Sequence, residues 1–189
     1  LYSTAPGVSK WVGFVGALSE EKRVHLAVEA VASRSDWGLL IAGDGPEERW
    51  LRSLADYLAP ERIRFLGRRS ELAEVFAMMD VLVLPSRTEG IPAVVIEAAM
   101  NRVPVVATNV GGVAETMANG VEGVLVDDAS VGGLTRALAS VLDGPARTTL
   151  IGGSKEQLLA RYDITQAAIA WDELLAKVAA TRTAPSRPS

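Results

Sequence analysis

One stretch of the sequence combines two glutamates, several small residues and a proline suited to starting a helix. It reads PSRTEGIPAVVIEAAM and occupies positions 85–100. Pro92 fits the first turn of a helix, because that position needs no backbone N–H donor. The free amides between Gly90 and Val94 would then point out of the helix start, where the helix dipole favours an anion. The stretch therefore predicts a site for a phosphate or another anion.

Glu97 is the unusual residue of this predicted helix. The other residues from Ala93 to Met100 are apolar, so we expect the helix to be buried all round. A buried carboxylate needs hydrogen-bond partners. Hydroxyl groups of a ligand would provide them, and so would a structural hydrogen bond to a neighbouring loop. The residues alone leave these two explanations open.

Short apolar runs alternate with longer amphipathic segments and predict the framework that positions these residues. The runs predict six strands, at Trp11–Val15, Trp37–Ala42, Ile63–Leu66, Val81–Leu84, Val103–Ala107 and Gly123–Val126. The segments between them predict helices at 20–33, 47–58, 70–79 and 92–100, and the remainder is expected to be helical with a break at Gly144-Pro145. Apolar strands separated by helices form a parallel sheet that is covered on both faces. We expect a doubly wound, Rossmann-like α/β domain of about six parallel strands over residues 10–180, with a linker at 1–9 and a flexible tail at 181–189.

Glycine follows nearly every predicted strand, at the edge where ligands bind in such a sheet. Small residues there let a bulky ligand lie against the backbone, which suggests a nucleotide or another phosphate-bearing molecule. Two familiar phosphate loops are missing. Residues 13–18 read GFVGAL and do not match G-x-G-x-x-G, and Gly152–Lys155 lacks the spacing of a P-loop. A dinucleotide-dependent dehydrogenase and a P-loop NTPase are therefore disfavoured.

The composition argues against several other kinds of site. The 189 residues include no cysteine, which excludes disulfides and thiolate metal sites. His25 is the only histidine, and we expect it to be structural rather than catalytic; Asp127-Asp128 is expected to form a turn and helix cap, so no metal site is predicted. The formal net charge of −4 disfavours a nucleic-acid partner. No apolar run reaches the ~18–20 residues that a bilayer requires, so no transmembrane segment is expected.

Six blocks follow one another in order between about residue 10 and residue 180. They are GALSEEK at 16–22, LIAGDGP at 40–46, IRFLG at 63–67, DVLVLPS at 80–86, the stretch at 85–100 described above, and PVVATNVGGVAE at 104–115. Glu89 and Glu97 flank seven residues of the fifth block, an E-x7-E pattern. Together the blocks resemble the retaining GT-B glycosyltransferases of the GT4 type. One E-x7-E pair arises by chance, whereas six collinear blocks are specific.

The resemblance implies the C-terminal half of a GT-B fold, which binds a nucleotide-diphosphate sugar as donor substrate and uses no metal or other cofactor. It implies that Glu89 faces the donor sugar, that Glu97 bonds the ribose hydroxyls and that Lys22 lies against the diphosphate. Glu89 and Lys22 are then the catalytic candidates, since a fixed cation stabilises charge on the departing phosphate. The other donor-binding residues that it implies are Gly16, Gly43, Gly67, Arg68, Gly90, Ile91, Pro92, Ala93 and Val94.

Ala17 is a departure from the family pattern. The family has an arginine at this position, so half of the usual cationic clamp on the diphosphate is missing. Arg23, where the family often has glycine, could supply the lost charge, and so could Arg87. The alternative is that both are solvated surface arginines.

The expected function is that of the donor-binding domain of a retaining glycosyltransferase, which transfers a hexosyl unit to an acceptor held by a separate N-terminal domain. One alternative is a non-catalytic nucleotide-sugar-binding module, which Ala17 makes credible. A nucleotide-sugar 2-epimerase fits the blocks less well. We expect a cytoplasmic location, with the N-terminal domain as a route to the inner face of the membrane. The isolated chain is expected to bind a nucleotide-sugar and to transfer little or nothing.

Overall fold

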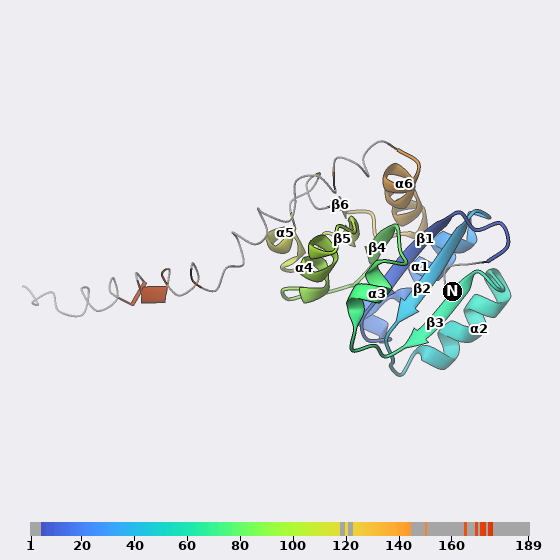
Figure 1. Ribbon diagram of the computed structural model, residues 1–189, viewed down its shortest axis with the longest axis horizontal. Helices are drawn as coiled ribbons and strands as arrows, with labels where there is room; N and C mark the ends of the chain where they lie inside the picture. The colour runs from blue at the N-terminus through green and yellow to red at the C-terminus, as the bar shows by residue number, and fades with distance from the viewer. Residues whose placement is uncertain are drawn as a thin grey trace, which may run out of the picture. The chain divides into compact units, whose positions relative to one another are not determined.

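The computed structural model describes residues 5–117, 120, 123–144, 150, 165, 169, 171, 172, 174 and 175. Within this part, six short apolar segments form a parallel sheet (Figure 1). The strands are β1 (Lys10–Val15), β2 (Trp37–Ala42), β3 (Ile63–Gly67), β4 (Val81–Leu84), β5 (Val105–Thr108) and β6 (Gly123–Val126). Their order is β3-β2-β1-β4-β5-β6, and all neighbouring pairs are parallel. The predicted doubly wound α/β sheet is confirmed.

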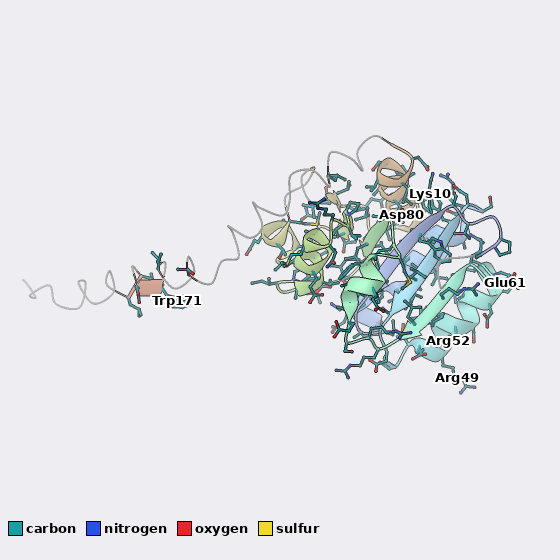
Figure 2. The ribbon with its side chains drawn as sticks, viewed as in Figure 1. Lys10, Arg49, Arg52, Glu61, Asp80 and Trp171 are labelled. Atoms are coloured by element: carbon teal, nitrogen blue, oxygen red, sulfur yellow. The ribbon has the colours of Figure 1, made fainter. Side chains whose placement is uncertain are left out.

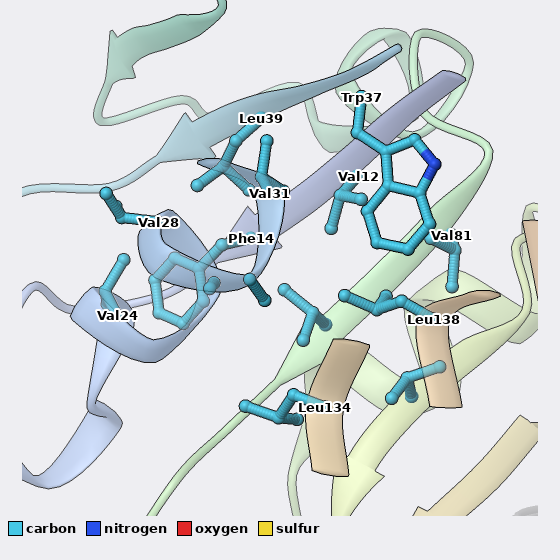
Figure 3. Packing of buried hydrophobic residues seen from close by; sticks show 14 of the residues in the cluster. Val12, Phe14, Val24, Val28, Val31, Trp37, Leu39, Val81, Leu134 and Leu138 are labelled. Carbon is cyan, nitrogen blue, oxygen red and sulfur yellow. The ribbon is translucent and has the colours of Figure 1, made fainter. Parts of the chain in front are cut away.

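Helices cover both faces of the sheet, as its apolar strands require. They are α1 (Val24–Ala32), α2 (Glu48–Leu58), α3 (Leu72–Phe76), α4 (Ala93–Met100), α5 (Val113–Thr116) and α6 (Val131–Leu142). Successive strand residues point to opposite faces. Val12 and Phe14 therefore pack with α1, α2 and α6 in the cluster that Figure 3 shows, whereas Trp11 and Val15 pack with α3, α4 and α5.

The strand order reverses between β1 and β4, which lie side by side in the middle of the sheet. A ligand site is expected beyond the carboxyl ends of the strands at such a reversal. The segments that leave these two ends are 16–23 after β1 and 85–92 after β4. At the amino ends, Asp80 accepts a hydrogen bond from the Trp11 amide at 2.7 Å, and Figure 2 labels Asp80 close to Lys10. The candidate site lies at the opposite edge.

Some predicted elements differ in extent. The helix expected at 20–33 is interrupted at Arg23, whose left-handed backbone (φ 46, ψ 42) separates a 3-10 turn, η1 (Glu20–Lys22), from α1. β5 begins at Val105 and not at Val103; Pro104, which lies between them, has no N–H to donate to the sheet. α3 is shorter than the helix expected at 70–79. The short helix α5 was not predicted as a separate element.

The chain divides into two units, Leu1–Ser154 and Lys155–Ser189. The sheet belongs to the first. The described residues of the second are helical and exposed: Thr165, Ile169, Trp171, Asp172, Leu174 and Leu175. Linker residues 1–4, the break expected at Pro145, residues 151–154 and the tail at 181–189 lie outside the described residues.

Candidate functional site

The loop after β4 places Glu89 against Lys22. The Lys22 Nζ donates to Glu89 Oε1 at 2.6 Å, and the Ser86 Oγ donates to the same oxygen at 2.5 Å. The Glu89 side chain is only 7% exposed, compared with 25% for Lys22. The structure thus brings together the two residues that the sequence suggested as catalytic, although they lie 67 positions apart in the chain.

Arg23 holds the start of the same loop. Its Nε donates to the Pro85 carbonyl at 2.8 Å and its Nη2 to the Ser86 carbonyl at 2.7 Å. Burial, and to a smaller extent the charge of Arg87, lowers the pKa of the Arg23 guanidinium. Arg23 is therefore bonded within the protein, and its description as a solvated surface arginine is wrong. Arg87 does lie at the surface, 61% exposed and paired with Glu20 at 3.3 Å.

The turn after β5 supports the loop from the other side. Thr108 Oγ1 donates to the Ser86 carbonyl at 2.6 Å, and the Gly112 amide donates to the Glu89 carbonyl at 3.2 Å. A Cβ at Gly111 (φ +52) would overlap the Glu89 carbonyl oxygen, and one at Gly112 would overlap the next carbonyl. Thr108, Gly111 and Gly112 are not among the site residues that the sequence predicts. The Gly-Gly pair after a predicted strand was the available signal, since it permits such close approach of two backbones.

A pocket of about 380 Å³ opens beyond the carboxyl ends of β1, β2 and β3. Its lining residues are Val15, Gly16, Ala17, Ala42, Gly43, Asp44, Arg68, Arg69 and Leu72. Gly16, Gly43 and Arg68 are predicted donor-binding residues, and Gly67 directly precedes Arg68. A Cβ at Gly43 (φ +147) would overlap the Gly16 carbonyl, so glycine is required for these two strand ends to meet. The pocket combines a wall of small residues with guanidinium groups, an arrangement suited to a polar anionic ligand.

The start of α4 is open to solvent. Gly90 and Ile91 are exposed, the latter by 68%, and Pro92 is buried at the N-cap position, one residue before the helix. The Pro92 side chain makes no hydrogen bond that would cap the helix start. The amides of Ala93 and Val94 belong to the first turn, whose N–H groups have no partners within the helix. This geometry agrees with the anion site predicted for residues 90–94.

Glu97 is half-buried, and α4 is not buried all round as expected. Only the side of α4 with Val95, Ala98 and Ala99 packs into the protein, whereas Ala93 and Met100 are exposed. The expectation was wrong because apolar composition alone does not show how many sides of a helix find neighbours. Within the described residues, the Glu97 side chain makes neither a hydrogen bond nor an ion pair, so the loop contact considered above is not found.

The residues considered for metal binding have other partners. Asp127 Oδ1 accepts from Asn109 Nδ2 at 2.8 Å, and Asp128 accepts from the Ser130 amide and from Arg136. Ser130 then caps α6 through the Gly133 amide. Within the described ranges, no group of three or more histidines and acids could hold a metal ion, and no helix is long and apolar enough to cross a membrane.

The parallel sheet is doubly wound, and the carboxyl ends of its strands carry a glycine-walled pocket, the Lys22–Glu89 ion pair and an open helix start. This is the architecture of a Rossmann-like domain, a class whose ligands bind at that edge of the sheet. The family model described as "Glycosyl transferases group 1" matches residues 3–157. The chain belongs to this family, as the six sequence blocks indicated, and its fold matches that of GT-B glycosyltransferase structures.

Two curated relatives and one solved structure illustrate the similarity. Glycogen synthase of Mycobacterium tuberculosis is 39% identical over 140 residues, which cover 70% of this chain and 34% of that protein. GDP-mannose-dependent alpha-mannosyltransferase of Corynebacterium glutamicum is 37% identical, covering 64% and 28%. Anabaena HepE in complex with UDP-glucose superposes with a TM-score of 0.78 at 25% identity, covering 88% of this chain and 48% of HepE. The chain spans about a third of the length of these curated relatives.

Proposed function

We propose that this chain is the donor-binding domain of a retaining glycosyltransferase. It binds a nucleotide-diphosphate sugar, and the complete protein transfers a hexosyl unit to an acceptor held by an N-terminal domain. The observation that carries the proposal is the contact between Lys22 and Glu89 at the reversal point of the sheet. The contact joins a cation to a nearly buried carboxylate at the place where this fold binds its ligand.

Each group has a role in the proposed transfer. The acceptor hydroxyl oxygen bonds to the anomeric carbon while the bond between that carbon and the diphosphate oxygen breaks. The departing diphosphate gains charge as it takes the bonding electrons, and it then takes the hydroxyl proton. The Lys22 ammonium stabilises that charge, because a cation held in place reorganises little during the reaction. Glu89 faces the donor sugar. The open amides of Ala93 and Val94 donate hydrogen bonds to phosphate or sugar hydroxyl oxygens at the start of α4.

The nucleoside end of the donor occupies the other half of the site. Glu97 bonds the ribose hydroxyls, which would give its half-buried carboxylate the partners it lacks within the described residues. The pocket lined by Gly16, Gly43 and Arg68 binds the rest of the nucleoside, and Gly67 lies at the border of this pocket. The proposal requires no metal or other cofactor and includes a cytoplasmic location. The base stays open, since one relative is named for GDP-mannose and HepE was solved with UDP-glucose.

Thermal unfolding with UDP-, GDP- and ADP-sugars tests the proposal, first in EDTA and then with a divalent metal in place of the EDTA. A donor at 100 times its Kd should add about 2.7 kcal/mol to the free energy of unfolding. Glu97→Gln should weaken binding of that donor about tenfold, the loss of roughly one charged hydrogen bond, without changing the Tm of the free protein. If no nucleotide-sugar raises the Tm, the proposal is wrong. If one does so only after a divalent metal is added, the metal-free part is wrong.

A second candidate function is a non-catalytic nucleotide-sugar-binding module. Ala17 favours it, because an uncharged methyl group lies in the wall of the pocket where a cation would help to hold a leaving diphosphate. The two functions predict the same binding and differ in turnover. Release of nucleoside diphosphate by the complete protein, with a panel of acceptors, would support the transferase; binding without release would support the module.

A further inference from the structure

The backbone of Arg23 suggests that this residue has a specific task. It lies between η1 and α1 in the left-handed region (φ 46, ψ 42). Glycine adopts this region readily, whereas a residue with a Cβ does so at an energetic cost. The interactions of the Arg23 side chain must therefore be worth that cost.

The guanidinium of Arg23 binds two successive carbonyls. Its Nε and Nη2 donate to Pro85 and Ser86 at 2.8 and 2.7 Å, directly after β4. Two donors in one rigid plane fix the direction of both acceptors, which a single ammonium group does not do. Arg23 thus sets the orientation of the peptide groups from which the Glu89 loop begins.

Ser86 transmits this orientation to Glu89. Its side chain is fully buried, and its hydroxyl donates to Glu89 Oε1 at 2.5 Å. The same oxygen accepts from Lys22, the residue directly before Arg23. Two consecutive residues therefore act on one carboxylate: Lys22 contacts it, and Arg23 reaches it through Ser86.

We propose that Arg23 is a positioning residue for Glu89. It fixes the carboxylate that faces the donor sugar, acts through Ser86, and is not a substitute for the missing cation of the diphosphate clamp. Both of its bonded nitrogens point at protein carbonyls. The inference rests on the proposed function of the site and adds a residue that determines recognition of the sugar, as distinct from the diphosphate.

Affinities of the Arg23→Gly variant test the inference, because glycine suits the left-handed backbone and removes only the side chain. Isothermal titration would compare the best-bound nucleotide-sugar with its nucleoside diphosphate. The sugar's contribution is the ratio of the affinity for the nucleotide-sugar to the affinity for the nucleoside diphosphate. We expect this ratio to fall about tenfold in Arg23→Gly, as expected for one lost hydrogen bond, and to fall similarly in Glu89→Gln. Affinity for the nucleoside diphosphate should change less than about twofold. Equal losses for both ligands, or no loss for either, would overturn the inference.

Arg87→Ala is the matched control. It removes a neighbouring positive charge whose guanidinium pairs with Glu20 and not with Ser86 or Glu89. It should leave the sugar's contribution unchanged, and a loss equal to that of Arg23→Gly would mean that charge alone is responsible. Arg23→Lys should recover only part of the effect, because an ammonium group does not fix the direction of both carbonyls. Full recovery would contradict the role of the planar guanidinium.

A measurement without ligand separates this inference from the proposed function. The side-chain carboxyl carbon of Glu89, followed by NMR in the free protein, should shift in Arg23→Gly and not in Arg87→Ala. An unchanged resonance in a folded Arg23→Gly variant would overturn the positioning role. If wild type binds no nucleotide-sugar while this resonance shifts, the proposed function fails and the link from Arg23 to Glu89 stands.

Discussion

Glu89 and Glu97 belong to one short segment, yet their carboxylates differ in burial and in hydrogen-bond partners. Glu89 is 7% exposed and accepts hydrogen bonds from Lys22 and Ser86. Glu97 lies half-buried on α4 and has no side-chain partner among the described residues. The first carboxylate is in place before any ligand arrives. The second is available to a ligand.

The difference follows from the backbone that carries each residue. Glu89 is in a loop, whose peptide groups must find partners elsewhere. Neighbouring segments supply them through Arg23, Thr108 and Gly112. Glu97 is in a helix, whose backbone groups hydrogen-bond within the helix itself. Its outward-facing side chain therefore needs no support from neighbouring segments. A fixed carboxylate suits the reacting sugar, since pre-organised groups reorganise little, whereas an open one suits recognition of the nucleoside.

The largest effect is expected from Gly111→Ala, which breaks the support of Glu89. The new Cβ would overlap the Glu89 carbonyl oxygen, and the positive φ of Gly111 disfavours any side chain. Overpacking together with left-handed strain should lower the free energy of unfolding by about 2–4 kcal/mol. Urea unfolding measures the loss, and donor affinity should fall with it because Glu89 moves.

Gly90→Ala provides the control for that substitution. Gly90 directly follows Glu89 in the loop after β4, and a Cβ there would meet nothing within 4 Å. Its free energy of unfolding should stay within about 0.5 kcal/mol of wild type. If Gly90→Ala and Gly111→Ala were equally destabilising, the contact between the two turns would not be what fixes Glu89.

A smaller effect is expected when the partner of each carboxylate is tested directly. Lys22→Met keeps most of the side-chain length but leaves the nearly buried Glu89 carboxylate without its ammonium partner. This should cost about 1–3 kcal/mol of stability. Glu97→Ala, which removes a carboxylate without a protein partner, should change stability by less than about 0.5 kcal/mol. Urea unfolding of both variants makes the comparison.

The double variant Lys22→Met/Glu89→Gln sharpens this result. It removes both charges, so no unpaired carboxylate remains, and part of the lost stability should return. If the two single substitutions lower the free energy of unfolding by amounts that simply add in the double variant, the two residues are not coupled. Equal losses of stability for Lys22→Met and Glu97→Ala would show that the two carboxylates do not differ in their dependence on protein partners.

The fold was readable from the sequence because its signals are local. Apolar runs as short as Val81–Leu84 favour strands covered on both faces, and the helices between them favour parallel order. The feature that was not predicted depends on contacts between distant parts of the chain. The left-handed turn at Arg23 was missed because arginine rarely adopts it, and it depends on two carbonyls more than 60 positions away.

The candidate site was readable in its residues and less so in its contacts. The blocks pointed to Glu89, Lys22 and Glu97, but residue types do not show which carboxylate is paired. The exposure of Glu97 depends on what packs against α4, and the support from Gly111 depends on how β5 meets β4. Both are properties of the assembled sheet.

The smallest effect on stability, and the clearest gain in function, is expected from Ala17→Arg. Ala17 is exposed in the wall of the pocket that also contains Asp44 and Arg68, so a long side chain there has room. Stability should change by less than about 0.5 kcal/mol. The added cation should raise affinity for the best-bound nucleoside diphosphate by about three- to tenfold, because a charged hydrogen bond to phosphate outweighs repulsion from the neighbouring guanidinium groups.

Ala17→Gln is the matched control, since it has similar reach and no charge. Isothermal titration with the nucleoside diphosphate and with the nucleoside itself separates the causes. A gain confined to Ala17→Arg and to the phosphorylated ligand would place the diphosphate beside this wall and extend the contrast between the glutamates. The carboxylate at Glu89 would then be complete in the natural chain, and the cationic side of the same site would be incomplete. An equal gain with the nucleoside, or with Ala17→Gln, would assign this part of the pocket to the base instead.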